Sequence, residues 1–190
     1  MKEIATGIDI LRDIALDQYG YVTMAQALDA GLTKAAVLML AHRGRLERAA
    51  VGVYRVPQVP VTAYDRYMLA VLWTGVPEAC LSHDTALEVY DVSDINPVTV
   101  HITVAKKRRI TRVGGERYVL HRQDLEPSDI SWWEGIPTIR LPIAIEQCIK
   151  SGVPTYLIRQ ALERAPKTGS LLPDDLDKLT GLLEGRNDRQ

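Results

Sequence analysis

Apolar residues near the start of the chain recur every three or four positions in three successive stretches. The first stretch predicts a helix with an apolar face made of Ile8, Leu11, Ile14 and Ala15. The second begins after Thr23, whose side chain suits a helix N-cap, and ends at Gly31. The third begins after Thr33 and ends before Gly44. The pattern therefore predicts three short helices, with a tight turn between the second and the third.

A change of pattern follows the third helix. Residues 46–48 and 53–56 are two short strand candidates around Ala49-Ala50-Val51-Gly52, which we call the wing. Three helices followed by a two-stranded hairpin is the order of a winged helix-turn-helix, whose last helix enters the DNA major groove. We therefore predict a DNA-binding winged helix-turn-helix domain over residues 1–57.

The rest of the chain changes between helical and strand periods. Two prolines make residues 57–60 a linker candidate, and residues 64–73 and 82–90 have helical spacing. Residues 98–104 alternate apolar and polar, as a half-buried strand does, and with residues 117–122 they predict a hairpin. Trp132 and Trp133 are expected to anchor a loop in the core, and the alternative is a stacking platform for bases. Further helices fill the remainder.

These elements predict the α+β class. A winged helix-turn-helix precedes a mixed α/β domain over residues 61–184, and a polar tail occupies 185–190. The apolar content of 46% over 190 residues suffices for one or two buried cores. Acidic residues interrupt the first apolar stretch, so it does not resemble a signal peptide, and no apolar run approaches the length of a membrane span. Cys80 and Cys148 are too few for a disulfide framework. A cytoplasmic protein without membrane association is expected.

Basic residues concentrate where the DNA would lie. Residues 1–30 carry two basic and five acidic groups, whereas residues 31–60 hold five basic groups against Glu47 alone: Lys34, Arg43, Arg45, Arg48 and Arg55. The net charge of −1 gives no global basic field, so affinity for nucleic acid must come from such local clusters. The alternative is a solvated face of a domain that contacts only protein.

A second basic cluster lies at the tip of the predicted 98–122 hairpin. We call residues 106–112 the basic segment, and its cations are Lys106, Lys107, Arg108, Arg109 and Arg112. The segment is interpreted as a second phosphate contact or a grip on an acidic partner. An equally consistent interpretation is a solvated tip whose like charges prevent aggregation.

The sequence offers no catalytic site, metal site or cofactor-binding motif. The histidines, His42, His83, His101 and His121, have no metal-ligand spacing. Ser82-His83-Asp84 places three triad residue types in a row, but neighbours at a helix start are expected to point apart, so Ser82 is interpreted as a cap. No glycine-rich phosphate loop is present. An enzyme, such as a nuclease with scattered carboxylates, is disfavoured.

Two stretches of the sequence resemble one family. The first reads GLTKAAVLMLAHRGRLERAAVGVYRV, and the second reads CLSHDTALEVYDV and is followed by VTVHITVAK. In this order they resemble the AbiEi-type antitoxins of bacterial type IV toxin–antitoxin and abortive-infection systems. The resemblance covers roughly residues 8–165.

This resemblance implies a transcriptional autorepressor that binds repeats in double-stranded promoter DNA. It also implies an antitoxin that counters a nucleotidyltransferase-like toxin, with or without a stable complex. The groove-facing positions it implies are Thr33, Lys34, Leu38, Met39, His42 and Arg43. The flanking backbone contacts would be Arg45, Arg48 and Arg55.

The sequence departs from the family at two places. Leu38 and Met39 stand where relatives often carry polar or basic side chains, and the wing has no arginine or lysine. Because of both departures, we expect DNA specificity to depend more on paired binding at repeats, on DNA shape, or on the basic segment. The alternative function is a protein-interaction module that neutralises its toxin by direct binding, without specific DNA recognition.

Overall fold

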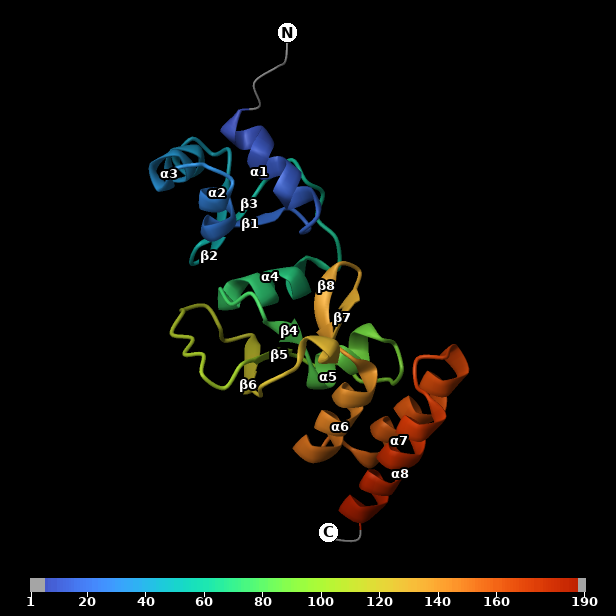
Figure 1. Cartoon of the computed structure of the whole chain (residues 1–190). Helices are drawn as coiled ribbons and strands as arrows, with labels where there is room; N and C mark the ends of the chain where they lie inside the picture. Colours follow the sequence, from blue (N-terminus) through green and yellow to red (C-terminus); the bar gives the residue numbers. More distant parts are fainter. Residues whose placement is uncertain (1–5, 188–190) are drawn as a thin grey trace. The chain divides into compact units, whose positions relative to one another are not determined.

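The computed structural model describes residues 6–187 (Figure 1). The chain forms two compact units: residues up to 77 with residues 109–115, and residues 78–108 with the chain from 116 onward. The first unit combines helices with a small sheet and the second has a larger mixed sheet, so the predicted α+β class is confirmed. The predicted domains, 1–57 and 61–184, remain a prediction, because compact units also gather segments that pack together from distant parts of the sequence.

The first unit contains four helices and three strands among its described residues. In chain order they are α1 (Gly7–Leu16), β1 (Tyr21–Thr23), α2 (Met24–Asp29), α3 (Lys34–His42), β2 (Glu47–Ala50), β3 (Val53–Arg55) and α4 (Asp65–Thr74). The three helices and the β2–β3 hairpin occur in the predicted order. Strand β1 was not predicted, and it pairs antiparallel with β3, which places β3 at the centre of the sheet.

Side-chain caps and one apolar cluster hold this unit together. Thr23 and Thr33 accept hydrogen bonds from the backbone N–H groups of Gln26 and Ala36, at 3.2 and 3.1 Å, so both predicted caps are confirmed. The buried cluster consists of Leu11, Ala15, Val22, Ala27, Val37, Leu46, Tyr54, Val56 and Val59. Val59 lies within the predicted 57–60 linker. Val59 thus joins this stretch to the core by burying its apolar side chain, whereas Gln58 and Pro60 are exposed.

The second unit is built on a five-stranded sheet. Its strands are β4 (Cys80–Leu81), β5 (Val100–Val104), β6 (Tyr118–Arg122), β7 (Ile130–Trp133) and β8 (Ile136–Ile139), in the spatial order β6-β5-β4-β8-β7. Its helices are α5 (His83–Val89), α6 (Leu141–Ser151), α7 (Thr155–Arg164) and α8 (Pro173–Asn187), and short 3-10 turns lie at Pro127–Asp129 and Ala165–Thr168. Within residues 6–187, no helix is long and apolar enough to cross a membrane.

The predicted hairpin over residues 98–122 is wrong. Strands β5 and β6 pair in parallel, with Val100 opposite Tyr118 and Val104 opposite Arg122. Parallel neighbours cannot be joined by a tight turn, because the chain must return to the same end of the sheet. Residues 105–117 make this return, and residues 109–115 within it belong to the first unit. The basic segment is therefore part of a crossover connection and not a hairpin tip.

A second apolar cluster fills the space around helices α5, α6, α7 and α8. It includes both cysteines: Cys80 and Cys148 are buried free thiols, and burial raises the pKa of Cys80 to about 12 and that of Cys148 well above its ordinary value. Trp132 is exposed on β7, an edge strand, so the expected anchoring of this tryptophan in the core is wrong. Helix α8 extends to Asn187, so residues 185–187 of the predicted tail are helical, and residues 188–190 lie outside the described residues.

Candidate nucleic-acid interface

Helix α3 is fixed by a tight turn before it and by one buried face. Gly31 adopts a positive φ of 88°, which glycine tolerates without strain, and the Leu32 N–H donates to the Ala27 carbonyl at 3.0 Å. Val37 is fully buried, and Leu40 packs against the same cluster. These contacts set which face of α3 points outward.

The outward face of α3 carries Ala35, Leu38, Met39 and His42, a set that we call the outward stripe. The spacing of three or four residues places all four on one side of the helix, opposite the buried Val37. All four are exposed, and Leu38 and Met39 retain 47% and 49% of their accessible surface. Three of the four side chains are apolar, and the stripe contacts no other part of the first unit strongly enough to be buried.

Basic residues precede and follow the stripe along the chain. Lys34 begins α3, Arg43 caps its end, and Arg45 and Arg48 follow along the chain; all four are exposed. Glu47 is the only acidic residue between positions 31 and 60. The surface around α3 therefore combines an apolar strip with positive charges at its margins, which suits a polyanion whose backbone flanks a less polar groove.

Backbone carbonyls of the wing accept hydrogen bonds from two directions. Its Gly52 carbonyl accepts a bond of 2.8 Å from the Met24 N–H at the start of α2. Its Val51 carbonyl accepts a bond of 2.9 Å from Arg112 Nη1, and the same nitrogen donates to the Trp73 carbonyl at 3.0 Å. Arg112 therefore fixes the wing instead of extending into solvent, and the sequence alone gave no sign of this role.

Arg55 also has a structural position. Its side chain is only 13% exposed, its Nη2 donates to the Val59 carbonyl at 2.6 Å, and its Nε lies 3.8 Å from Asp65 Oδ2. Asp65 is itself buried and accepts hydrogen bonds from the backbone and hydroxyl of Thr62. A guanidinium held in this way has little surface to offer a phosphate, and the role of Arg55 as a DNA contact stays a prediction.

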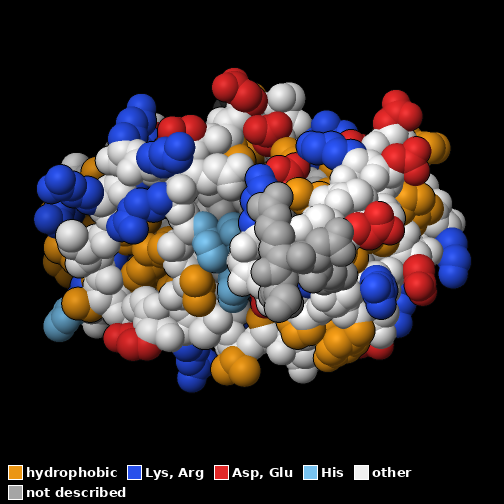
Figure 2. Space-filling view, turned by 90° about the horizontal axis from the view of Figure 1, so that it is seen from below, with side chains coloured by type: hydrophobic (Ala, Val, Ile, Leu, Met, Phe, Trp, Pro, Cys, Tyr) orange, Lys and Arg blue, Asp and Glu red, His pale blue; other side chains and the backbone are white. Residues whose placement is uncertain are grey.

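A third arginine with protein partners, after Arg112 and Arg55, is Arg108 in the basic segment. Arg108 makes two hydrogen bonds to the Glu78 carboxylate, of 2.5 and 2.9 Å, and this partner lowers the pKa of Glu78. Lys106, Lys107 and Arg109 are exposed. In Figure 2, Lys and Arg side chains gather on one part of the face in view. Because Arg108 and Arg112 are bound to protein acceptors, the segment offers fewer free positive charges than its sequence suggests.

The second unit holds a cluster of three histidines that the sequence analysis did not bring together. The rings of His83 and His121 stack with centroids 3.4 Å apart, and His121 Nε2 lies 3.1 Å from His101 Nδ1. Ser82 Oγ lies 3.0 Å from His83 Nδ1 and accepts a hydrogen bond from Thr103 Oγ1 at 2.8 Å. Figure 2 shows that histidine rings reach the molecular surface on the face in view. We call His83, His101 and His121 the histidine cluster.

Two expectations about this region are wrong. Ser82 directly precedes α5, but its side chain does not cap the helix, and instead it touches His83. The contact is possible because His83 has a positive φ of 50°, which turns its ring away from the direction usual at a helix start. Strand β5 is also not half-buried, because Thr103 on its polar face is fully buried. The sequence showed that the polar residues His101 and Thr103 alternate with apolar neighbours. It did not show that His121 is the parallel partner of Thr103.

The cluster consists of uncharged rings. Burial and the neighbouring rings lower the pKa of His83 to about 3 and that of His121 to about 4, and burial also lowers the pKa of His101. Ser82 is fully buried, so its hydroxyl cannot reach a substrate as a nucleophile would. Among residues 6–187, no group of three or more His, Cys, Asp or Glu side chains is arranged to hold a metal ion. The arrangement works as a hydrogen-bonded polar core.

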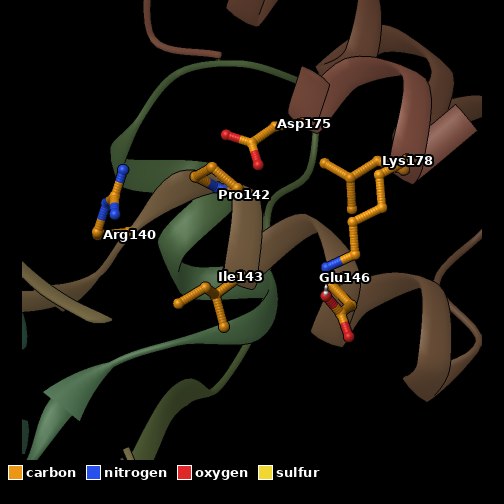
Figure 3. A pocket seen from close by; sticks show the side chains of 7 residues that line it. Arg140, Pro142, Ile143, Glu146, Asp175 and Lys178 are labelled. Atoms are coloured by element: carbon orange, nitrogen blue, oxygen red, sulfur yellow. Dashed lines mark hydrogen bonds and ion pairs between the residues drawn. The ribbon is translucent and has the colours of Figure 1, made fainter. Parts of the chain in front are cut away.

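A small pocket of about 110 Å³ lies in the second unit (Figure 3). Its lining residues are Arg140, Pro142, Ile143, Glu146, Asp175, Lys178 and Leu179. Glu146 is paired with Lys150 at 2.5 Å and with Lys178 at 3.1 Å, and these partners lower its pKa. The Glu146 carboxylate is thus paired with two lysines, whereas Arg140 and Asp175 also contribute charged side chains to the lining.

Three comparisons with known proteins bear on this interface. Residues 9–57 match a family model described as "Transcriptional regulator, AbiEi antitoxin", so an AbiEi antitoxin transcriptional regulator domain lies in the N-terminal part of the chain, as the sequence predicted. In the structural comparison, the chain is similar to the Rv2827c protein from Mycobacterium tuberculosis, with a TM-score of 0.56 and 14% identity over 98% of this chain and 79% of that one. This similarity concerns the fold. No curated protein matches the chain.

Proposed function

We propose that the first unit is a winged helix-turn-helix that binds double-stranded DNA through α3 and the wing. The observation that carries this proposal is the exposed outward stripe with cations at its margins. It lies within the residues that match a transcriptional regulator family. Positive groups at the two ends of an exposed helix suit the phosphate backbones that border a major groove.

The proposed contacts divide into two groups. Those on α3 are Thr33, Lys34, Leu38, Met39, His42 and Arg43, and those beside it are Arg45 and Arg48. Thr33 Oγ1 accepts the capping bond from Ala36, which leaves its hydroxyl hydrogen to donate to a phosphate. Arg55 is left out of the proposal. Lys106, Lys107 and Arg109 are proposed as a second contact, without the engaged Arg108 and Arg112.

We further propose that the protein represses its own operon and acts as the antitoxin of a nucleotidyltransferase-like toxin. The description of the matching family supports an antitoxin that regulates transcription. Repeats in the promoter would let two DNA-binding domains, each of modest affinity, bind together with a specific affinity that neither has alone. We assign the antitoxin role to residues 61–184 and propose neither an enzymatic activity nor a cofactor.

A gel-shift titration tests the DNA-binding proposal. The full chain is titrated against the DNA upstream of its own gene and against a scrambled fragment of the same length, each at two salt concentrations. Tighter binding to the upstream fragment at both salts is expected, since specific contacts add to the salt-dependent phosphate term. Equal binding to both fragments would contradict the regulator, and no shift at all would contradict DNA binding.

One observation favours a second candidate function. The apolar outward stripe also suits a protein surface, so the unit is alternatively a module that binds its toxin directly. Co-purification of the toxin encoded beside the gene, abolished by Leu38→Asp and accompanied by no DNA shift, would support this function. The reciprocal result, a DNA shift abolished by Leu38→Asp, would exclude it.

A further inference from the structure

We propose that Leu38 and Met39 read DNA sequence by contacting thymine methyl groups, so that the preferred sites of this protein carry thymines where α3 enters the major groove. The inference rests on the proposed DNA binding and adds its specificity. The outward stripe is what α3 presents to a groove, because Val37 on the opposite side is fully buried.

The side chains of the stripe restrict which base edges they can recognise. Arginine, lysine, asparagine and glutamine supply the usual hydrogen bonds to purines in the major groove, and the stripe has none of them. Its only polar group is the His42 ring, at the last position of the helix. Lys34 begins α3 outside the stripe, where it suits the phosphate backbone. Direct recognition by α3 must therefore depend mainly on apolar contact.

Thymine is the base that offers such a contact. Its 5-methyl group is the only apolar substituent that the four standard bases expose in the major groove. Leu38 and Met39 retain 47% and 49% of their surface in the folded protein, so each has apolar area left to bury against a methyl group. Each methyl group removed from water contributes a factor of about four to affinity.

Charge around the stripe favours DNA over a protein as its occupant. Lys34, Arg43, Arg45 and Arg48 are exposed, and Glu47 is the only acid in the same stretch. A protein surface that met this strip would have to be both apolar and strongly acidic at its margins, whereas a DNA groove has phosphates on both sides.

The test uses DNA in which every thymine is replaced by deoxyuridine. This replacement removes the 5-methyl group and leaves the Watson–Crick edge unchanged. The full chain first selects a duplex from a random-sequence pool, and its affinity is then measured for the thymine and the uracil forms of that duplex. Loss of two methyl contacts is expected to weaken binding about 15-fold.

A double variant distinguishes contact from changes in DNA shape. In Leu38→Ala with Met39→Ala the uracil form should bind as well as the thymine form, because the partners of the methyl groups are gone. Leu16→Ala, which truncates an even more exposed leucine on α1, should keep the full wild-type difference. The circular dichroism spectrum and the thermal unfolding transition of each variant are compared with those of the wild type to verify that it is folded.

Two results would overturn the inference, and a third would reach further. Equal affinity of the wild-type chain for the two duplexes would leave DNA binding intact but remove thymine recognition. A uracil penalty that persists in the double variant would assign the effect to DNA shape. Failure to select or shift any duplex would overturn the proposed function, and this inference with it.

Discussion

The α3 surface of the first unit and the histidine cluster of the second unit hold their basic side chains in opposite ways. Around α3, Lys34, Arg43 and Arg48 remain exposed and are set at the margins of an apolar strip. In the second unit, the histidine cluster is packed into a polar core where burial keeps the rings uncharged. The first arrangement leaves charge available to a partner, whereas the second removes it from solvent and uses the ring nitrogens for internal hydrogen bonds.

The difference shows that a residue type predicts chemistry only together with its burial. Three arginines illustrate this within the clusters that look basic in sequence. Arg55, Arg108 and Arg112 are each engaged by protein acceptors, namely a buried carbonyl, a carboxylate and two carbonyls. A count of cations along the chain therefore overestimates the positive surface available to DNA.

The buried histidine cluster predicts that the stability of the second unit depends strongly on pH. The folded pKa values of about 3 for His83 and about 4 for His121 lie below the ordinary value of 6.5, so the unfolded chain binds more protons between these limits. The stabilisation is fully present above pH 6.5 and is lost as the pH falls below it. We expect the free energy of unfolding to drop by about 3 kcal/mol between pH 7 and pH 5.

Urea unfolding at the two pH values, read by hydrogen exchange of the β5 and β6 peptides, measures this drop. His121→Gln should reduce it, since one of the titrating rings is gone. Equal unfolding free energies at pH 7 and pH 5 would show that the rings are not held uncharged, and the comparison would fail.

The exposed cations at the two ends of α3 predict a loss of DNA affinity when Lys34→Ala is combined with Arg43→Ala. Removal of two phosphate contacts should weaken binding by a factor of about 10 to 100 and reduce the salt slope by about 2. Arg159→Ala with Lys167→Ala removes the same charge from exposed positions of the second unit and serves as the control. If both pairs weaken binding equally, net charge and not the α3 surface governs affinity.

Arg112 and Arg109 sharpen the comparison within the basic segment itself. Arg112→Ala leaves the Val51 and Trp73 carbonyls without their donor, so we expect a loss of about 2 kcal/mol in the stability of the first unit. The exposed neighbour Arg109 offers a matched control, and Arg109→Ala should leave stability unchanged. Thermal unfolding of the two variants measures the difference. A smaller loss for Arg112→Ala than for Arg109→Ala would refute the wing-holding role.

The smallest effect is expected from Glu78→Gln. The substitution removes the charge that holds Arg108, but both side chains are partly exposed, and such ion pairs contribute little to stability. Urea unfolding of this variant should agree with the wild type within experimental error. A clear loss of stability would place Arg108 with Arg112 among the arginines on which the fold depends.

The sequence predicted the elements whose signals are local. Thr23 and Thr33 lie next to the helices they cap, and Gly31 lies within the turn it allows, so each was readable from a few neighbouring residues. The stripe on α3 also follows from helical spacing once the buried Val37 is known. The match to the AbiEi transcriptional regulator model also falls on this stretch, residues 9–57.

The features that the sequence did not reveal depend on distant partners. Strand β1 exists because it pairs with β3, and β5 pairs in parallel with β6 although both were expected to form a hairpin. The bond from Arg112 to Val51 joins residues 61 positions apart. Neither periodicity nor charge counts contain such pairings, because each requires the whole chain to be folded first.

The burial of Cys80 and Cys148 makes the natural chain suitable for site-specific labelling. Because both thiols are enclosed and their pKa values are raised, maleimide reagents will react preferentially with a cysteine introduced at an exposed position. Ala35→Cys places such a thiol on the outward stripe without replacing a native cysteine. A fluorophore attached there would report, in real time and in the otherwise unaltered chain, what approaches α3.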